Sequence, residues 1–219
     1  MTDNEIKKLS ARAKELVMEY SKIPVISSIL DRLGSELPAD LYYHNLLHTL
    51  EVMEDSIFFA LYDNLEDDQI KLLAIAAAYH DSGYIYQRDN NETIAAELAK
   101  KELEKDGNFS KEEIQTIATM IEDTTVLIVD HQFTRLVSCD LSRYLLDADM
   151  ANLGSSDFFE KNRLIQKETG MEEDKFYQLS LSLLKSHRWL SPAAEALQEE
   201  QRLKNLKILE NSETNKQNT

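Results

Sequence analysis

An uninterrupted apolar run at residues 72–79 ends directly at the pair His80 and Asp81, and this junction constrains the fold more than any other feature. A run of this kind has to be buried in a folded chain. Two chargeable groups at the end of a buried segment are costly unless they are paired or bound to a metal. We therefore expect a buried helix that delivers an imidazole and a carboxylate to an internal polar site.

The rest of the chain also favours helices. Gly and Pro number only 5 and 3, and 42% of residues are hydrophobic, which is enough for a core. Apolar residues recur at helical spacing over 3–22 and 45–62. Asp67 or Asp68 can cap the apolar helix that ends at His80, and Ser110 followed by Glu113 fits a capping box that opens a further helix. We predict an all-α helical bundle, with three more helices after residue 155 and a loop at 124–129.

The length of 219 residues suits one domain of ordinary size. We expect a single helical domain over 1–210, with its motif-bearing core at about 42–154 and a disordered polar tail at 211–219. No apolar stretch is long enough to span a bilayer, and the first residues lack the apolar core of a signal peptide. The single Cys139 suits a reducing compartment. These features predict a cytoplasmic protein with no membrane association.

The formal net charge of −16 disfavours general nucleic-acid binding, because so acidic a surface repels a polyphosphate backbone. It does not exclude a small anionic substrate, since a bound metal ion can invert the local field in one pocket. Acidic helical domains of this size also often form homodimers. The charge is therefore compatible with a small anionic partner and disfavours a polymeric one.

Two further clusters carry groups that can hold a metal. His44 and His48 are four residues apart, so both imidazoles share one face if the helix already begins at His44. Asp147 and Asp149 lie within an otherwise apolar stretch, where carboxylates seek a cation. Taken singly, each cluster is also compatible with an ordinary surface pair or helix end.

Four segments, in this order, resemble the HD superfamily of metal-dependent phosphohydrolases. They read YHNLLHT at 43–49, YHDSGYI at 79–85, NETIA at 91–95 and DADMANLG at 147–154. The first is similar to the segment found in cyclic-nucleotide phosphodiesterases, and the others to segments of small bacterial members. The resemblance covers about 42–154 and implies an HD-domain helical bundle.

The resemblance also implies a role for each matching residue. His48, His80, Asp81 and Asp149 match the metal ligands, and His44 matches the histidine that protonates the leaving oxygen. Asp81 would also orient the attacking water. Four further positions would support the ligands or contact the substrate: Asn45, Tyr84, Glu92 and Asp147.

Mixed nitrogen and oxygen ligands suit Mn, Fe, Co, Ni or Zn, with Mg as an alternative. Many dinuclear members of the family carry extra histidines before the final aspartate, and the corresponding stretch 120–124 has none. Glu122 or Asp123 would have to substitute for them. His131 is expected on a surface loop and His187 in helical packing, so we expect one ion, with a second if Asp81 bridges.

The sequence is compatible with three functions. The leading one is hydrolysis of a phosphate mono- or diester, with nucleotides and cyclic nucleotides among the candidate substrates. The second is a non-catalytic HD module that binds a metal or nucleotide as a sensor. The third is a di-iron oxygenase, which would need histidine ligands that the sequence lacks.

Overall fold

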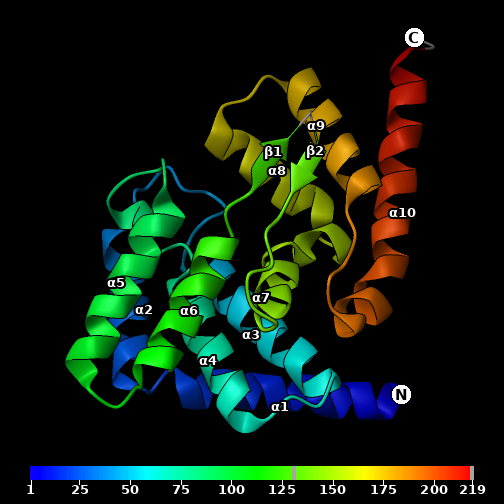
Figure 1. Cartoon of the computed structure of the whole chain (residues 1–219). Helices are drawn as coiled ribbons and strands as arrows, with labels where there is room; N and C mark the ends of the chain where they lie inside the picture. Colours follow the sequence, from blue (N-terminus) through cyan, green and yellow to red (C-terminus); the bar gives the residue numbers. More distant parts are fainter. Residues whose placement is uncertain (130–131, 218–219) are drawn as a thin grey trace.

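The structure is a computed structural model that describes residues 1–129 and 132–217. Helices dominate it, and Figure 1 shows the long C-terminal helix along one side of the molecule. The first half contains α1 (Asp3–Tyr20), α2 (Pro24–Glu36), α3 (Leu46–Tyr62), α4 (Asp67–Tyr79), the short 3-10 helix η1 (Ser82–Ile85), α5 (Asn91–Asp106) and α6 (Lys111–Asp123). The second half contains β1 (Leu127–Val129), β2 (Gln132–Thr134), α7 (Ser142–Asp149), η2 (Ala151–Gly154), α8 (Phe158–Thr169), α9 (Glu173–Ser186) and α10 (Pro192–Gln217).

The main hydrophobic core is built from α1 to α7, and α4 lies within it. From Leu73 to Tyr79 every side chain of α4 is buried, as the apolar run at 72–79 predicts. A second, smaller core lies between η2, α8, α9 and α10, around Leu153, Phe158 and Leu184. The all-α expectation is confirmed, and the metal-ligand motifs lie on elements of the main core.

Several local predictions can be compared with the structure. Ser110 caps α6 through the predicted capping box. The cap of α4 is Glu66 rather than Asp67 or Asp68, because its carboxylate and the side-chain amide oxygen of Gln69 form a capping box over the first turn. The loop expected at 124–129 is wrong for its second half, since 127–129 pair antiparallel with 132–134 in a small hairpin. The β-branched residues there explain the extended conformation.

The segment 211–219, expected as a disordered tail, is helical as far as Gln217, and residues 218–219 lie outside the described residues. Helix α10 continues to Gln217, past the last apolar position at Leu209. The added segment contains Glu, Lys and Gln, which favour helices, and it has no Gly or Pro. Across the described residues, no helix is both long and apolar enough to cross a membrane.

Candidate metal centre

His48 is held by the way in which α3 begins. Asn45 is the N-cap residue, and its side-chain oxygen accepts from the backbone N–H of Leu47 at 2.9 Å and of His48 at 3.4 Å. Its amide also donates to the Tyr42 carbonyl at 3.0 Å. The helix thus starts after His44, so His44 and His48 do not share a helical face as the sequence allowed. Asn45 acts as a structural cap that fixes both imidazoles.

His80 and Asp81 follow the last residue of α4. The Nδ1 atom of His80 donates to the Ala77 carbonyl at 2.7 Å, which leaves Nε2 directed away from the helix. The chain then turns into η1, where Gly83 lies against the start of α5. A Cβ atom at Gly83 would overlap the backbone carbonyl of Asn91. Glycine is therefore required for the tight turn that holds Asp81 beside His80.

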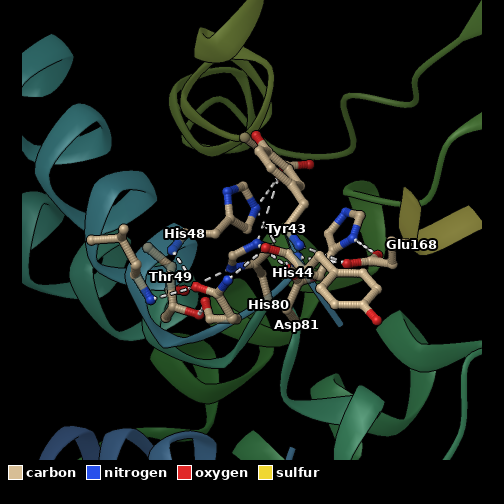
Figure 2. A network of polar contacts seen from close by, with 12 residues as sticks. Tyr43, His44, His48, Thr49, His80, Asp81 and Glu168 are labelled. Atoms are coloured by element: carbon tan, nitrogen blue, oxygen red, sulfur yellow. Dashed lines mark hydrogen bonds and ion pairs between the residues drawn. The ribbon is translucent and has the colours of Figure 1, made fainter. Parts of the chain in front are cut away.

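Asp149, the last residue of α7, brings a second carboxylate to these imidazoles (Figure 2 shows the surroundings). Its Oδ1 atom lies 3.2 Å from His48 Nε2 and 3.6 Å from His80 Nε2. Asp81 Oδ2 lies 3.5 Å and 3.2 Å from the same two atoms. The fold thus brings the four predicted ligands from α3, α4 and α7 into one cluster.

Charge interactions within the cluster dominate its titration. Burial alone would lower the pKa of His80, but the adjacent Asp81 carboxylate and the contact with Asp149 raise it well above its usual value. Burial would raise the pKa of Asp81, and the positive charge of His80 lowers it instead. The pKa of Asp149 is likewise lowered, against the effect of burial, by its bonds to His48 and His80. The cluster therefore favours ionised carboxylates.

The donor set fits a divalent metal ion. One ligand atom each from His48, His80 and Asp81 lies within 4.8 Å of the others, and all three residues are buried. His80 Nε2 and Asp81 Oδ2 have no hydrogen-bond partner in the described structure. Buried polar atoms without a partner are rare, and an ion between them would satisfy both. Imidazole and carboxylate ligands suit a transition metal.

His44 forms a second functional group beside this cluster. Its Nδ1 atom makes a very short hydrogen bond to Oε1 of Glu168, from α8. Glu168 Oε2 accepts from the backbone N–H groups of Tyr43 at 2.8 Å and His44 at 3.1 Å. Burial lowers the pKa of His44, but the bond to Glu168 and the carboxylate of Asp81 outweigh it and raise the pKa. The arrangement favours a protonated imidazole.

Sequence reasoning did not find Glu168. It lies 124 residues from His44 in the chain, in a helix with no motif of its own.

Two of the predicted supporting residues, Tyr84 and Glu92, also lie near the cluster. The ring of Tyr84 lies 5.2 Å from the His44 ring. Glu92 lies in the first turn of α5, where burial and then the charge of Asp81 raise its pKa.

Asp147 does not face the metal ligands. It is fully buried and accepts from the backbone N–H groups of Leu190 and Ser191 and from the Ser191 hydroxyl, at 2.7–3.0 Å. The guanidinium of Arg135 lies 3.7 Å away. Asp147 therefore anchors the start of α10, and only Asp149 of the acidic pair reaches the cluster.

None of the other predicted ligands joins the site within the described residues. Asp123 accepts from the Ser138 N–H at 2.7 Å and its hydroxyl at 2.6 Å, and Glu122 pairs with Lys100 at 3.6 Å. His187 packs against Trp189, with ring centroids 4.3 Å apart. His131 lies outside the described residues. The structure thus offers one four-residue ligand set.

Two cavities adjoin the site. The first, of about 190 Å³, is lined by His44 and Asp149 together with apolar residues of η2, α8 and α9. The second, of about 370 Å³, lies on the other side of His48 and is lined by polar groups of α3, α8 and α10, among them Glu51, Lys161 and Gln198. The first cavity contains both a predicted ligand and the predicted acid.

Comparison with known proteins agrees with this geometry. A search of curated proteins gave no match. The model of the HD domain family matches residues 45–210, which contain the four clustered imidazole and carboxylate groups and Glu168, and begin just after His44. This confirms the resemblance drawn from the motifs. Because the match extends over well more than half of the chain, the protein belongs to the HD domain family.

Proposed function

We propose that this protein is a metal-dependent phosphohydrolase that cleaves a phosphate mono- or diester. The observation that supports it most directly is a pair of buried atoms, His80 Nε2 and Asp81 Oδ2, which lie 3.2 Å apart without a hydrogen bond, within a set of four ligand-type side chains. His48, His80, Asp81 and Asp149 would hold the ion. A bound divalent ion would lower the pKa of the water that it binds and polarise a phosphoryl oxygen.

The chain's own residues supply the remaining chemistry. Asp81 is placed to orient the attacking water, because its carboxylate lies between the two imidazoles of the cluster. His44 protonates the oxygen of the departing alcohol. Glu168 occupies Nδ1 of His44, so the proton is delivered from Nε2. Glu168 thereby fixes the ring orientation and favours the charged form.

The test is metal content and turnover measured on the same samples. Purified protein, loaded in turn with Mn, Fe, Co, Ni, Zn or Mg, is assayed with 4-nitrophenyl phosphate and bis(4-nitrophenyl) phosphate. We expect hydrolysis of at least one ester, and loss of both bound metal and turnover in Asp81→Asn and His80→Ala. Asp68→Asn, on the exposed first turn of α4, is the matched control and should change neither.

Two results would contradict the proposal. Tight metal binding without turnover of either ester or of a nucleotide panel would favour a sensor module. Two iron ions per chain with oxygen consumption would favour an oxygenase.

A further inference from the structure

We propose that the alcohol released by this enzyme is compact and apolar, about the size of one ring, and that it binds in the 190 Å³ cavity beside His44. The inference rests on the proposed phosphohydrolase function and narrows its substrate class. A cavity of about 150 Å³ lined by apolar side chains holds a benzene molecule. The cavity here is of similar size, so it fits a single ring or a short branched alkyl group.

The position of the cavity assigns it to the leaving group. His44 and Asp149 both line it, so it begins where the proton donor and a metal ligand meet. In the reaction, the water oxygen bonds to phosphorus and the bond from phosphorus to the alcohol oxygen breaks. The electron pair stays on that oxygen, which takes the proton from His44, while a water proton passes to solvent. The group attached to that oxygen must therefore lie next to His44.

The second cavity does not meet this requirement. It touches His48 but neither His44, His80, Asp81 nor Asp149. Its walls carry carboxylates, amides and the Lys161 ammonium, which is paired with Glu51 at 3.0 Å and Asp157 at 3.3 Å. An alcohol bound there would be out of reach of the proton donor. The apolar cavity is the one that can receive the product alcohol.

The chemistry of the walls sets the class of alcohol. Away from the metal end, the described lining is mainly Leu153, Phe158, Ile165, Phe176, Leu179 and Leu183, and it includes no Lys or Arg. Three polar side chains, Asn152, Asn162 and Ser180, also line the cavity, and the last two satisfy each other: the Asn162 amide donates to Ser180 Oγ at 3.1 Å, and Ser180 donates to the Phe176 carbonyl at 2.9 Å. A sugar or a second phosphate would lose more hydration than the single Asn152 amide could replace. An uncharged apolar group has no hydrogen bonds to water that it would lose on entering the cavity.

The experiment compares esters that differ only in the alcohol. Metal-loaded protein is assayed with benzyl phosphate, 3-methylbutyl phosphate, glycerol 2-phosphate and a nucleoside 5′-phosphate. We expect kcat/KM for the two apolar esters to exceed that for the other two by about tenfold or more, as differences of a few buried carbons produce in apolar pockets. Equal values, or a preference for glycerol 2-phosphate or the nucleotide, would overturn the inference while leaving the proposed function intact.

A variant that fills the cavity links the preference to this site. Leu179→Trp should lower kcat/KM for the apolar esters about tenfold or more, and by a smaller factor for glycerol 2-phosphate, which gains little from the apolar walls. Leu203→Trp is the matched control, because Leu203 lies on α10 with 49% of its surface exposed and lines neither cavity. Leu179→Ala, which enlarges the cavity, should instead shift the preference toward larger apolar alcohols. If neither Leu179 variant changes the preference, the cavity does not bind the alcohol.

Binding of the product separates this inference from the proposed function. Benzyl alcohol should bind saturably to the metal-loaded protein in NMR titrations, glycerol should not, and Leu179→Trp should abolish binding. Benzyl alcohol binding without hydrolysis of any ester would refute the proposed function and retain the apolar site. If benzyl alcohol does not bind and kcat/KM is the same for all four esters, the apolar site alone is refuted.

Discussion

Replacing Glu168 by glutamine should weaken the acid catalyst without removing a metal ligand. The carboxylate of Glu168 accepts from His44 Nδ1 and from two backbone N–H groups, and its side chain is only 3% exposed. A glutamine can keep the backbone contacts through its oxygen, but it carries no charge. The pKa of His44 should then fall, because the largest interaction that raises it against the effect of burial is lost.

The size of the effect follows from the bond that is weakened. A hydrogen bond to a charged group contributes about 1.5–3 kcal/mol. If it is needed to hold the protonated imidazole in the transition state, kcat should fall roughly 10- to 150-fold. Because a general acid must be protonated, activity is lost as the pH rises through its pKa. In Glu168→Gln this loss should move to lower pH.

The assay compares two leaving groups over a pH series, with metal content measured in parallel. An alkyl phosphate needs a proton on its departing oxygen, whereas 4-nitrophenolate leaves readily without one, so kcat should fall much more for the alkyl ester. Glu160→Gln, on the exposed side of α8, removes the same charge and should leave both rates unchanged. An equal fall for both esters with no displacement of the pH profile would refute the role given to Glu168.

Three further predictions concern stability. Asp147→Ala should cost about 3–5 kcal/mol in urea unfolding, because it leaves the N–H groups of Leu190 and Ser191 without their acceptor and removes the carboxylate that faces the Arg135 guanidinium. A loss below 1 kcal/mol would contradict this. Burial, and then the charge of Arg135, lowers the pKa of His187 to about 3, so the unfolded chain takes up its proton first and stability falls as the pH drops below about 6.5. His187→Phe should remove about 2 kcal/mol of the difference between pH 7 and pH 5. Burial raises the pKa of Asp55 to about 7, so the ionised side chain lowers the free energy of unfolding progressively as the pH rises from about 4 to about 7. Asp55→Asn should therefore raise the free energy of unfolding by about 1–2 kcal/mol at pH 8 and leave it unchanged at pH 4. This gain is smaller than complete burial would give, because the side chain keeps some solvent access.

Local patterns in the sequence accounted for most helices and for the metal-ligand cluster. The apolar run before His80 predicts a helix that is buried on all sides. Helical periodicity and the Ser110 capping box depend only on residues that are close in the chain, so both can be recognised from the sequence. The order of the motifs then sufficed to bring residues as distant as His48 and Asp149 into one hypothesis. Their separation of 101 residues is closed by the packing of α3 against α7.

What the sequence did not predict depends on tertiary contacts. The motif predicted that Asp149 faces the imidazoles, but it placed Asp147 beside the ligands or the substrate, and only the tertiary contact with Ser191 shows that Asp147 anchors the start of α10 instead. The cap at Glu66 instead of Asp67 is a choice between adjacent acidic residues with similar propensity. Glu168 has no local signal at all, because its partner His44 belongs to a different part of the chain.

The hydrogen bond between His44 and Glu168 joins the two hydrophobic cores of the protein. The four clustered ligands come from α3, α4 and α7, which pack in the main core, whereas Glu168 comes from α8, which packs in the smaller core with α9 and α10. Asp147 ties the start of α10 to α7, and Phe158 anchors α8 in the smaller core. The metal ligands can therefore be in place whenever the main core is folded. The contact between His44 and Glu168 and the apolar cavity are complete only when α8 and α9 are docked, so under the proposed function metal binding and turnover would depend on different parts of the fold.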